Sequence, residues 1–98
     1  MIIVTGSAHV GADAIDEALR ISVEHVQRSR QEPGCLVHSV HRDVEDPNHL
    51  VFLEHWADSH ALLAHFAVPE SRAFARALTA LADTAPEIEI HEAVPLHL

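Results

Sequence analysis

The spacing of apolar positions changes several times along the chain, and each change marks a predicted element. Residues 2–10 are mainly β-branched and apolar and end at a glycine, which indicates a strand. From Asp13 onward, apolar side chains recur every three or four positions, which predicts an amphipathic helix of about five turns. Its apolar positions are Ile15, Leu19, Val23 and Val26. The helix is expected to end before Pro33-Gly34, because proline disfavours helix and glycine permits a reversal.

The middle of the chain predicts a hairpin. Residues 35–43 and 50–56 have the composition of strands, and Glu45-Asp46-Pro47-Asn48 between them is typical of a turn. The two strands are therefore expected to pair antiparallel.

Two helices and a last strand are predicted after the hairpin. Asp58 or Ser59 is a suitable N-cap for a short helix through Phe66, and Pro69 is suited to the first position of the next helix. Pro86 ends that helix, and the alternation around residues 87–91 indicates a strand with one buried face.

The resulting order, βαββααβ, predicts a single domain over residues 1–98 with a ferredoxin-like α+β fold, in which helices cover one face of an antiparallel sheet. Side chains alternate between the faces of a strand, so apolar residues must also lie on the uncovered face. Among them are Ile3, Val37, Val51 and Leu53. We therefore expect a homodimer in which the sheet faces of two copies pack together.

Composition narrows the classes of partner. Six basic and fifteen acidic residues give a formal charge of −9, which opposes binding to nucleic acid and to anionic membrane surfaces. The N-terminal residues are better explained as a strand than as a signal peptide, so a cytoplasmic protein without a membrane span is expected.

Several short motifs together resemble one family. They are Glu32-Pro33-Gly34-Cys35-Leu36, Asp46-Pro47, Glu54-x-Trp56, Ala61-x-x-Ala64-His65 and the Pro69 that follows. In order and spacing they resemble the antibiotic biosynthesis monooxygenase family of dimeric α+β barrels, and the resemblance spans essentially the whole chain. The resemblance implies the fold and the dimer. It does not imply a single activity, since members include cofactor-independent oxygenases of phenols or quinols, haem-degrading enzymes, an isomerase and proteins without a known reaction.

The resemblance is uneven at the family's functional positions. One group of oxygenases has active-site residues at the positions of Phe52, Trp56, Leu62 and about Arg76, but with asparagine and tyrosine in place of Phe52 and Leu62. The quinol-oxidising branch is similar at Glu54, Trp56 and His65, with a tyrosine where this chain has His38. The haem-degrading branch has a tryptophan in place of His65 and a ligating histidine near Ala75. Both are missing here, so no haem or other cofactor is expected.

The candidate site combines an imidazole base with an apolar lining. Oxidation of a phenol by dioxygen without a metal or flavin requires a base, and His65 is the first choice with His38 second. Glu54 is expected to orient an imidazole, Trp56 to form a wall, and Arg76 to stabilise negative charge. The predicted substrate pocket is lined by Phe52, Leu62, Phe66 and Phe74.

The leading functional hypothesis is therefore a cofactor-independent monooxygenase acting on a small phenolic or quinol-like aromatic. The alternatives are a non-catalytic dimer that binds a small ligand, and an isomerase of a small polar metabolite. Each candidate residue also has an adequate structural explanation in packing, capping or ion pairing. No metal site is expected, because the chain has no recognised metal motif, and His60 and His65 would lie about 140° apart around a helix.

Overall fold

The computed structural model describes residues 1–98 and has the predicted order of elements. The strands are β1 (Ile2–His9), β2 (Cys35–Arg42), β3 (His49–Trp56) and β4 (Glu87–Glu92). The helices are α1 (Ile15–Ser29), α2 (Ser59–Ala67) and α3 (Pro69–Leu81). No helix combines the length and hydrophobicity that a membrane crossing requires.

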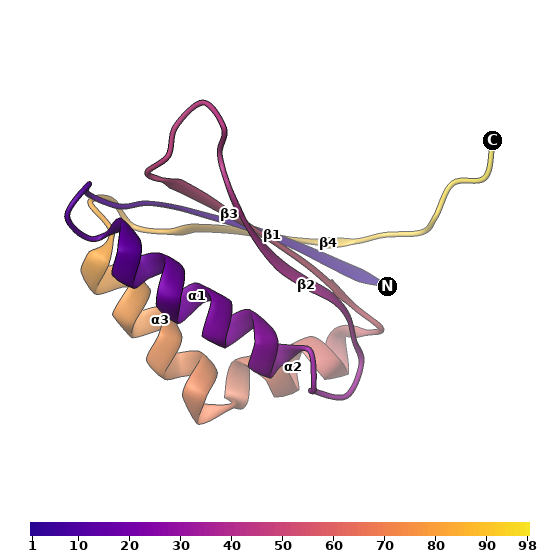
Figure 1. Ribbon diagram of the computed structural model, residues 1–98. Coiled ribbons are helices and arrows are strands. Elements are labelled where there is room, and N and C mark those ends of the chain that lie inside the picture. The colour runs from indigo at the N-terminus through magenta and orange to yellow at the C-terminus, as the bar shows by residue number, and fades with distance from the viewer.

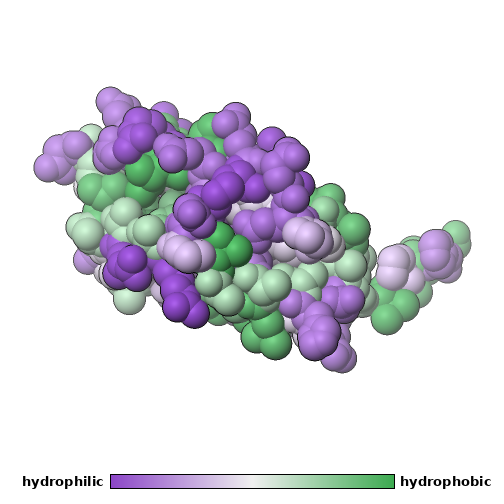
Figure 2. All heavy atoms as spheres, turned by 90° about the horizontal axis from the view of Figure 1, so that it is seen from below, coloured by the Kyte–Doolittle hydropathy of each residue, from purple (hydrophilic) through white to green (hydrophobic).

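The four strands form one sheet in the order β2-β3-β1-β4, and every neighbouring pair is antiparallel. All three helices lie on the same side of the sheet, with α1 and α3 side by side beneath it (Figure 1). This confirms the ferredoxin-like α+β prediction. The helix layer carries hydrophilic and hydrophobic side chains intermixed, and the C-terminal segment projects from one end of the molecule (Figure 2).

The core lies between the sheet and the helices. Alternate residues of β3 face the helices and are buried, whereas Val51, Leu53 and His55 between them are only partly buried. Two clusters fill the core, one around Leu50, and a smaller one around Trp56. Both Leu50 and Trp56 have no exposed surface.

The ends of the helices agree with the local sequence. Asp58 is the N-cap of α2, and its Oδ1 accepts a hydrogen bond of 2.9 Å from the backbone N–H of Ala61. Pro69 occupies the first turn of α3, where a missing N–H costs nothing. Gly34 has φ +81°, so the reversal after α1 uses the left-handed region that glycine tolerates.

Two expectations about which side chains face inward are wrong. In α1 the predicted positions Ile15 and Val26 are buried together with Ala18, Ser22, His25 and Ser29, whereas Val23 is 44% exposed. In β4 the alternation predicted one buried face, but every residue is exposed, including Ile88 and Ile90. In β2 the register with β3 shifts between Cys35 and Val37 at a β-bulge, and Leu36 is 58% exposed.

Candidate functional site

Three buried histidines from three different elements meet between the sheet and the helices. They are His25 of α1, His38 of β2 and His65 of α2, which are between 2% and 5% exposed. Their ring centroids lie 5.1 Å (His25 to His38), 5.4 Å (His25 to His65) and 5.4 Å (His38 to His65) apart. We call them the histidine cluster. His25 was not among the candidates identified from the sequence.

Backbone register places Glu54 beside this cluster. His38 and Glu54 are paired residues of β2 and β3, so both side chains point to the helix layer. Glu54 Oε1 accepts a 2.8 Å hydrogen bond from Nε1 of Trp56. The same oxygen lies 3.4 Å from His38 Nε2 and 3.9 Å from His65 Nε2. The carboxylate therefore sits between the indole and two imidazoles.

Glu54 is held in its charged form. Burial acts to raise the pKa of its carboxyl, but the nearby His38, the hydrogen bond from Trp56 and the charge of His65 outweigh burial and lower the pKa. A carboxylate at this depth is consequently available as a proton acceptor near neutral pH.

His65 is oriented by a second carboxylate. Glu32, in the loop after α1, lies 2.8 Å from Nδ1 of His65. A carboxylate can only accept here, so Nδ1 carries a proton, and in the neutral form of the ring Nε2, the nitrogen nearer Glu54, has the free lone pair. Glu32 thus fixes the tautomer of His65.

His25 is held by Arg28 and Phe74. An N–H of Arg28 donates to Nδ1 of His25 at 2.7 Å and to the hydroxyl of Ser71 at 3.0 Å. The imidazole stacks on the ring of Phe74 with centroids 3.9 Å apart and an angle of 6°. Burial lowers the pKa of His25 to about 3, and the positive charge of Arg28 acts in the same direction. His25 is therefore neutral in the folded protein.

His38 has no hydrogen-bond partner at either ring nitrogen, although the residue is only 2% exposed. An unpartnered buried polar group is costly, and in native proteins it often marks a functional position. The nitrogen nearest a carboxylate is Nε2, whose contact with Glu54 does not have the geometry of a hydrogen bond.

A cavity of about 200 Å³ opens beside Glu54, between the sheet and α3. Its lining combines aromatic rings, polar groups and small residues. The inner part is lined by Phe52, Glu54, His25, Phe74 and Leu78, and the part toward β4 by Gly6, Ser7, Pro86, Glu87 and Ile88. A flat, mostly apolar small molecule suits such a lining.

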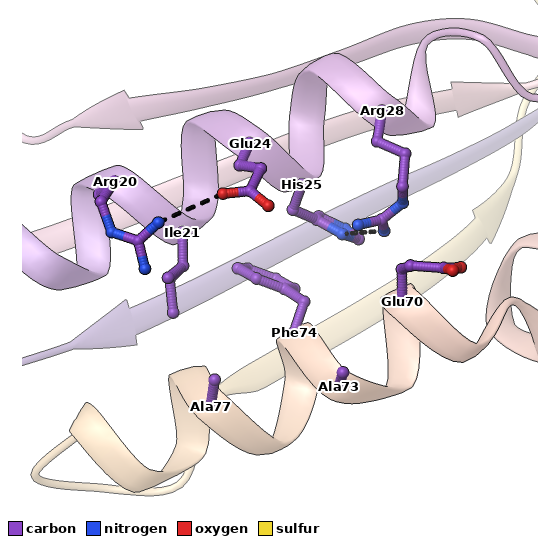
Figure 3. A pocket seen from close by; sticks show the side chains of 9 residues that line it. All are labelled: Arg20, Ile21, Glu24, His25, Arg28, Glu70, Ala73, Phe74 and Ala77. Atoms are coloured by element: carbon purple, nitrogen blue, oxygen red, sulfur yellow. Dashed lines mark hydrogen bonds and ion pairs between the residues drawn. The ribbon is translucent and has the colours of Figure 1, made fainter.

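A second, outer groove of about 470 Å³ runs between α1 and α3 (Figure 3). His25 and Phe74 line both this groove and the inner cavity, so their stacked rings form part of the wall between the two. Figure 3 shows Glu24 and Glu70 on the helices that flank the groove, and Arg28 turned toward His25.

The residues predicted from the sequence fall into three groups. Phe52, Glu54 and Phe74 line the inner cavity. His38, Trp56 and His65 lie behind Glu54 as buried neighbours. Leu62, Phe66 and Arg76 do not line the cavity.

The last group is explained by helix geometry. Leu62 packs into the core cluster around Trp56. Phe66 follows His65 directly and is 37% exposed, since one residue turns a helix by about 100°. Arg76 comes two residues after Phe74 and is exposed on the opposite side of α3. Arg76 is therefore not placed to stabilise charge in this cavity.

Comparison with known proteins agrees with this architecture. The model of the antibiotic biosynthesis monooxygenase family matches residues 1–77. The chain belongs to this family. Its crystal structures include an antibiotic biosynthesis monooxygenase that is 33% identical, with a TM-score of 0.89 over 97% of this chain and all of that one.

A Deinococcus radiodurans protein assigned to the antibiotic biosynthesis monooxygenases is 31% identical, with a TM-score of 0.94 over all of this chain and 97% of that one. A conserved Methanosarcina mazei protein, 24% identical with a TM-score of 0.88 over 92% of this chain and 89% of that one, shares the fold. An uncharacterised protein of Synechocystis sp. is 32% identical over 91 residues, 93% of this chain. The chain spans 62% of that relative's length.

Proposed function

We propose that the protein is a cofactor-independent monooxygenase that oxidises a small phenolic or quinol-like aromatic with dioxygen. The observation that carries the proposal is the placement of an ionised, buried carboxylate, Glu54, in the wall of an aromatic-lined cavity with imidazoles behind it. Membership of a family named for monooxygenases supports the reaction class.

The cavity favours a planar aromatic. Phe52 and Phe74 meet edge to face with centroids 5.9 Å apart, and both line the space beside Glu54. A ring inserted there would contact aromatic side chains, while its hydroxyl would reach the polar end formed by Glu54 and His25. A negatively charged metabolite is less well matched, because its charge would be buried beside the like charge of the Glu54 carboxylate.

Glu54 is the proposed proton acceptor. Its Oε1 is engaged by Trp56, which leaves the second carboxylate oxygen for the substrate hydroxyl. His65 Nε2 lies 3.9 Å from Oε1 of Glu54 and can accept the substrate proton from it, because the contact with Glu32 keeps the proton of the neutral imidazole on Nδ1. His65, the first choice from the sequence, thus becomes a supporting base behind Glu54.

The electrons come from the substrate itself. The phenolate passes one electron to dioxygen, and recombination of the resulting radical with superoxide forms a carbon–oxygen bond. The hydroperoxide then loses water and leaves a carbonyl. One oxygen atom enters the product and the other leaves in water, so a hydroquinone becomes a hydroxyquinone without an added reductant. The protein contributes deprotonation and an enclosed site.

Oxygen uptake with a panel of hydroquinones and anthrones tests the proposal. The measurement uses chelator-treated protein and compares the wild type with Glu54→Gln and His65→Ala. Removing a general base typically lowers the rate about 100-fold or more, so Glu54→Gln should show such a loss and His65→Ala a smaller one. Glu45→Gln, an exposed loop glutamate, is the matched control and should keep full activity. Absence of uptake above background with every substrate, in protein shown to be folded, would refute the proposal.

A further inference from the structure

The histidine cluster has the composition and spacing of a transition-metal site. His25, His38 and His65 each offer a ring nitrogen, and these three atoms lie within 4.8 Å of one another. Around one tetrahedral zinc ion, ligand atoms are about 3.3 Å apart and imidazole centroids about 5 Å apart. The centroid separations of 5.1 to 5.4 Å already fit this arrangement, so rotations of the rings in place would bring the nitrogens together.

We propose that His25, His38 and His65, with Glu54 as fourth ligand, bind a divalent transition-metal ion such as Zn²⁺. This site goes beyond the proposed oxygenase reaction and does not depend on it. The Glu54 oxygen lies 3.4 Å from His38 Nε2 and 3.9 Å from His65 Nε2, close to the ligand separations of such a site.

An unpartnered side chain points to the same conclusion. His38 is almost fully buried, yet neither of its nitrogens has a hydrogen-bond partner in the protein. A metal ion on one of these nitrogens would use the lone pair that the fold leaves unsatisfied.

The surroundings resemble the outer shell of known metal sites. Glu32 accepts from Nδ1 of His65, the carboxylate–histidine arrangement that orients a metal ligand and raises its basicity. The two negative charges of Glu54 and Glu32 would balance the two positive charges of the ion. The outer groove reaches His25, and its lining carries Glu24 and Glu70 together with Arg20 and Arg28, so it gives a polar approach to the cluster.

Arg28 is the group that opposes the ion. Its guanidinium donates to Nδ1 of His25 and places a positive charge beside the cluster. The same nitrogen already donates to the hydroxyl of Ser71, so Arg28 keeps a partner when it releases His25. Arg28→Gln should consequently bind zinc more tightly than the wild type.

Zinc binding to the folded, chelator-treated protein tests the proposal, with zinc measured by competition against a chromophoric chelator and cobalt by its tetrahedral visible absorption. One ion per chain is expected. His38→Gln should abolish the binding, and Glu32→Ala should weaken it about 10- to 100-fold. His9→Gln is the matched control, because His9 contacts two aspartates on the surface and lies outside the cluster. Retention of zinc binding in His38→Gln, or its loss in His9→Gln, would overturn the proposal.

Wild-type protein gives a second readout that does not depend on whether a core variant folds. In two-dimensional NMR spectra of the histidine side chains, zinc should shift the ring nitrogens of His25, His38 and His65 together. Shifts confined to exposed histidines, or no saturable binding, would overturn the proposal. If the oxygenase proposal also holds, zinc should inhibit oxygen uptake, because the ion occupies the lone pairs that receive the substrate proton. Zinc binding without any oxygenase activity would leave the metal site standing and refute only the enzyme.

Discussion

At the scale of single residues, His9 joins two loops at the edge of the fold. Its Nδ1 lies 2.8 Å from Asp83 and its Nε2 lies 3.0 Å from Asp46. The hydrogen bond to Asp83 raises the pKa of His9 above 6.5, and Asp46 adds to the effect. His9 therefore holds the loop after β2 and the segment after α3 together when it is protonated.

This contact should make stability depend on pH. Because the pKa is higher in the folded state, the contribution is complete below about pH 6.5 and is lost as the pH rises through the folded pKa. His9→Gln should lower the urea midpoint at about pH 5.5 and change it much less at about pH 9. His91→Gln, an exposed histidine with a contact only to Glu89, is the control. If His9→Gln lowered the urea midpoint equally at both pH values, the ion pairs of His9 would not contribute to stability.

His25 shows which part of the site the sequence could not reveal by hydropathy. Apolar periodicity in α1 selects Val23, which is exposed, as well as the buried Ile15 and Val26, whereas the buried positions are 15, 18, 22, 25, 26 and 29. Three of these six are serine or histidine and three are isoleucine, alanine or valine. The helical spacing of His25 from the other buried residues of α1 is visible in the sequence. A role for this histidine can be inferred only once His38 and Glu54 are known to lie on the sheet face opposite it.

At the scale of elements, the turn into β2 depends on Gly34. Its φ of +81° is unfavourable for other residues, and a Cβ there would lie 2.5 Å from the Cβ of Ala61 in α2. The carbonyl of Gly34 also accepts a 2.8 Å hydrogen bond from the N–H of Ala57. This turn therefore sets how closely α2, with His65, approaches the sheet.

Gly34→Ala should destabilise the protein by about 1–3 kcal/mol, since it combines a left-handed backbone with overpacking against α2. Thermal or urea unfolding measures the effect. Gly6→Ala is the control, because its Cβ would meet neighbours only at 3.5 Å or more. Similar stabilities of the two variants would mean that the turn relaxes without cost.

Elements were more predictable than the site. Strand and helix periods, together with Pro69 and the Asp58 cap, were sufficient for the order of elements and nearly all their ends. The bulge in β2 was not predictable, because it depends on pairing with β3. Contacts between residues far apart in the chain, such as Glu32 with His65, depend on how the elements pack, which local patterns do not specify.

At the scale of the whole molecule, the outer face of the sheet is not covered by any element of the chain (Figure 1). Val51 and Leu53 of β3 alternate with the buried residues that face the helices, so they lie on this outer face. Association of two such faces would remove apolar surface from water, which is why the dimer remains our prediction.

Sedimentation at micromolar concentration tests the predicted sheet-to-sheet dimer. The wild type should sediment as a dimer of the 10.8 kDa chain, and Leu53→Lys should be monomeric because it places a charge in the interface. Leu63→Lys alters an exposed leucine of α2, on the helix side, and should stay dimeric. A monomeric wild type would exclude the sheet-to-sheet dimer.

Ionisation of a phenol beside Glu54 is the step on which the proposed reaction depends. Para-nitrophenol reports it directly, because its phenolate absorbs visible light and its neutral form does not. The measurement follows the spectrum of this probe bound to metal-free protein, at a pH about one unit below the probe's own pKa. The predicted result is a saturable rise of the phenolate band with the wild type, because Glu54 passes the proton to His65 and the resulting imidazolium offsets the charge of the phenolate, and no rise with Glu54→Gln, which cannot pass the proton on. Binding of the probe in its neutral form, or an equal rise in both proteins, would contradict the claim.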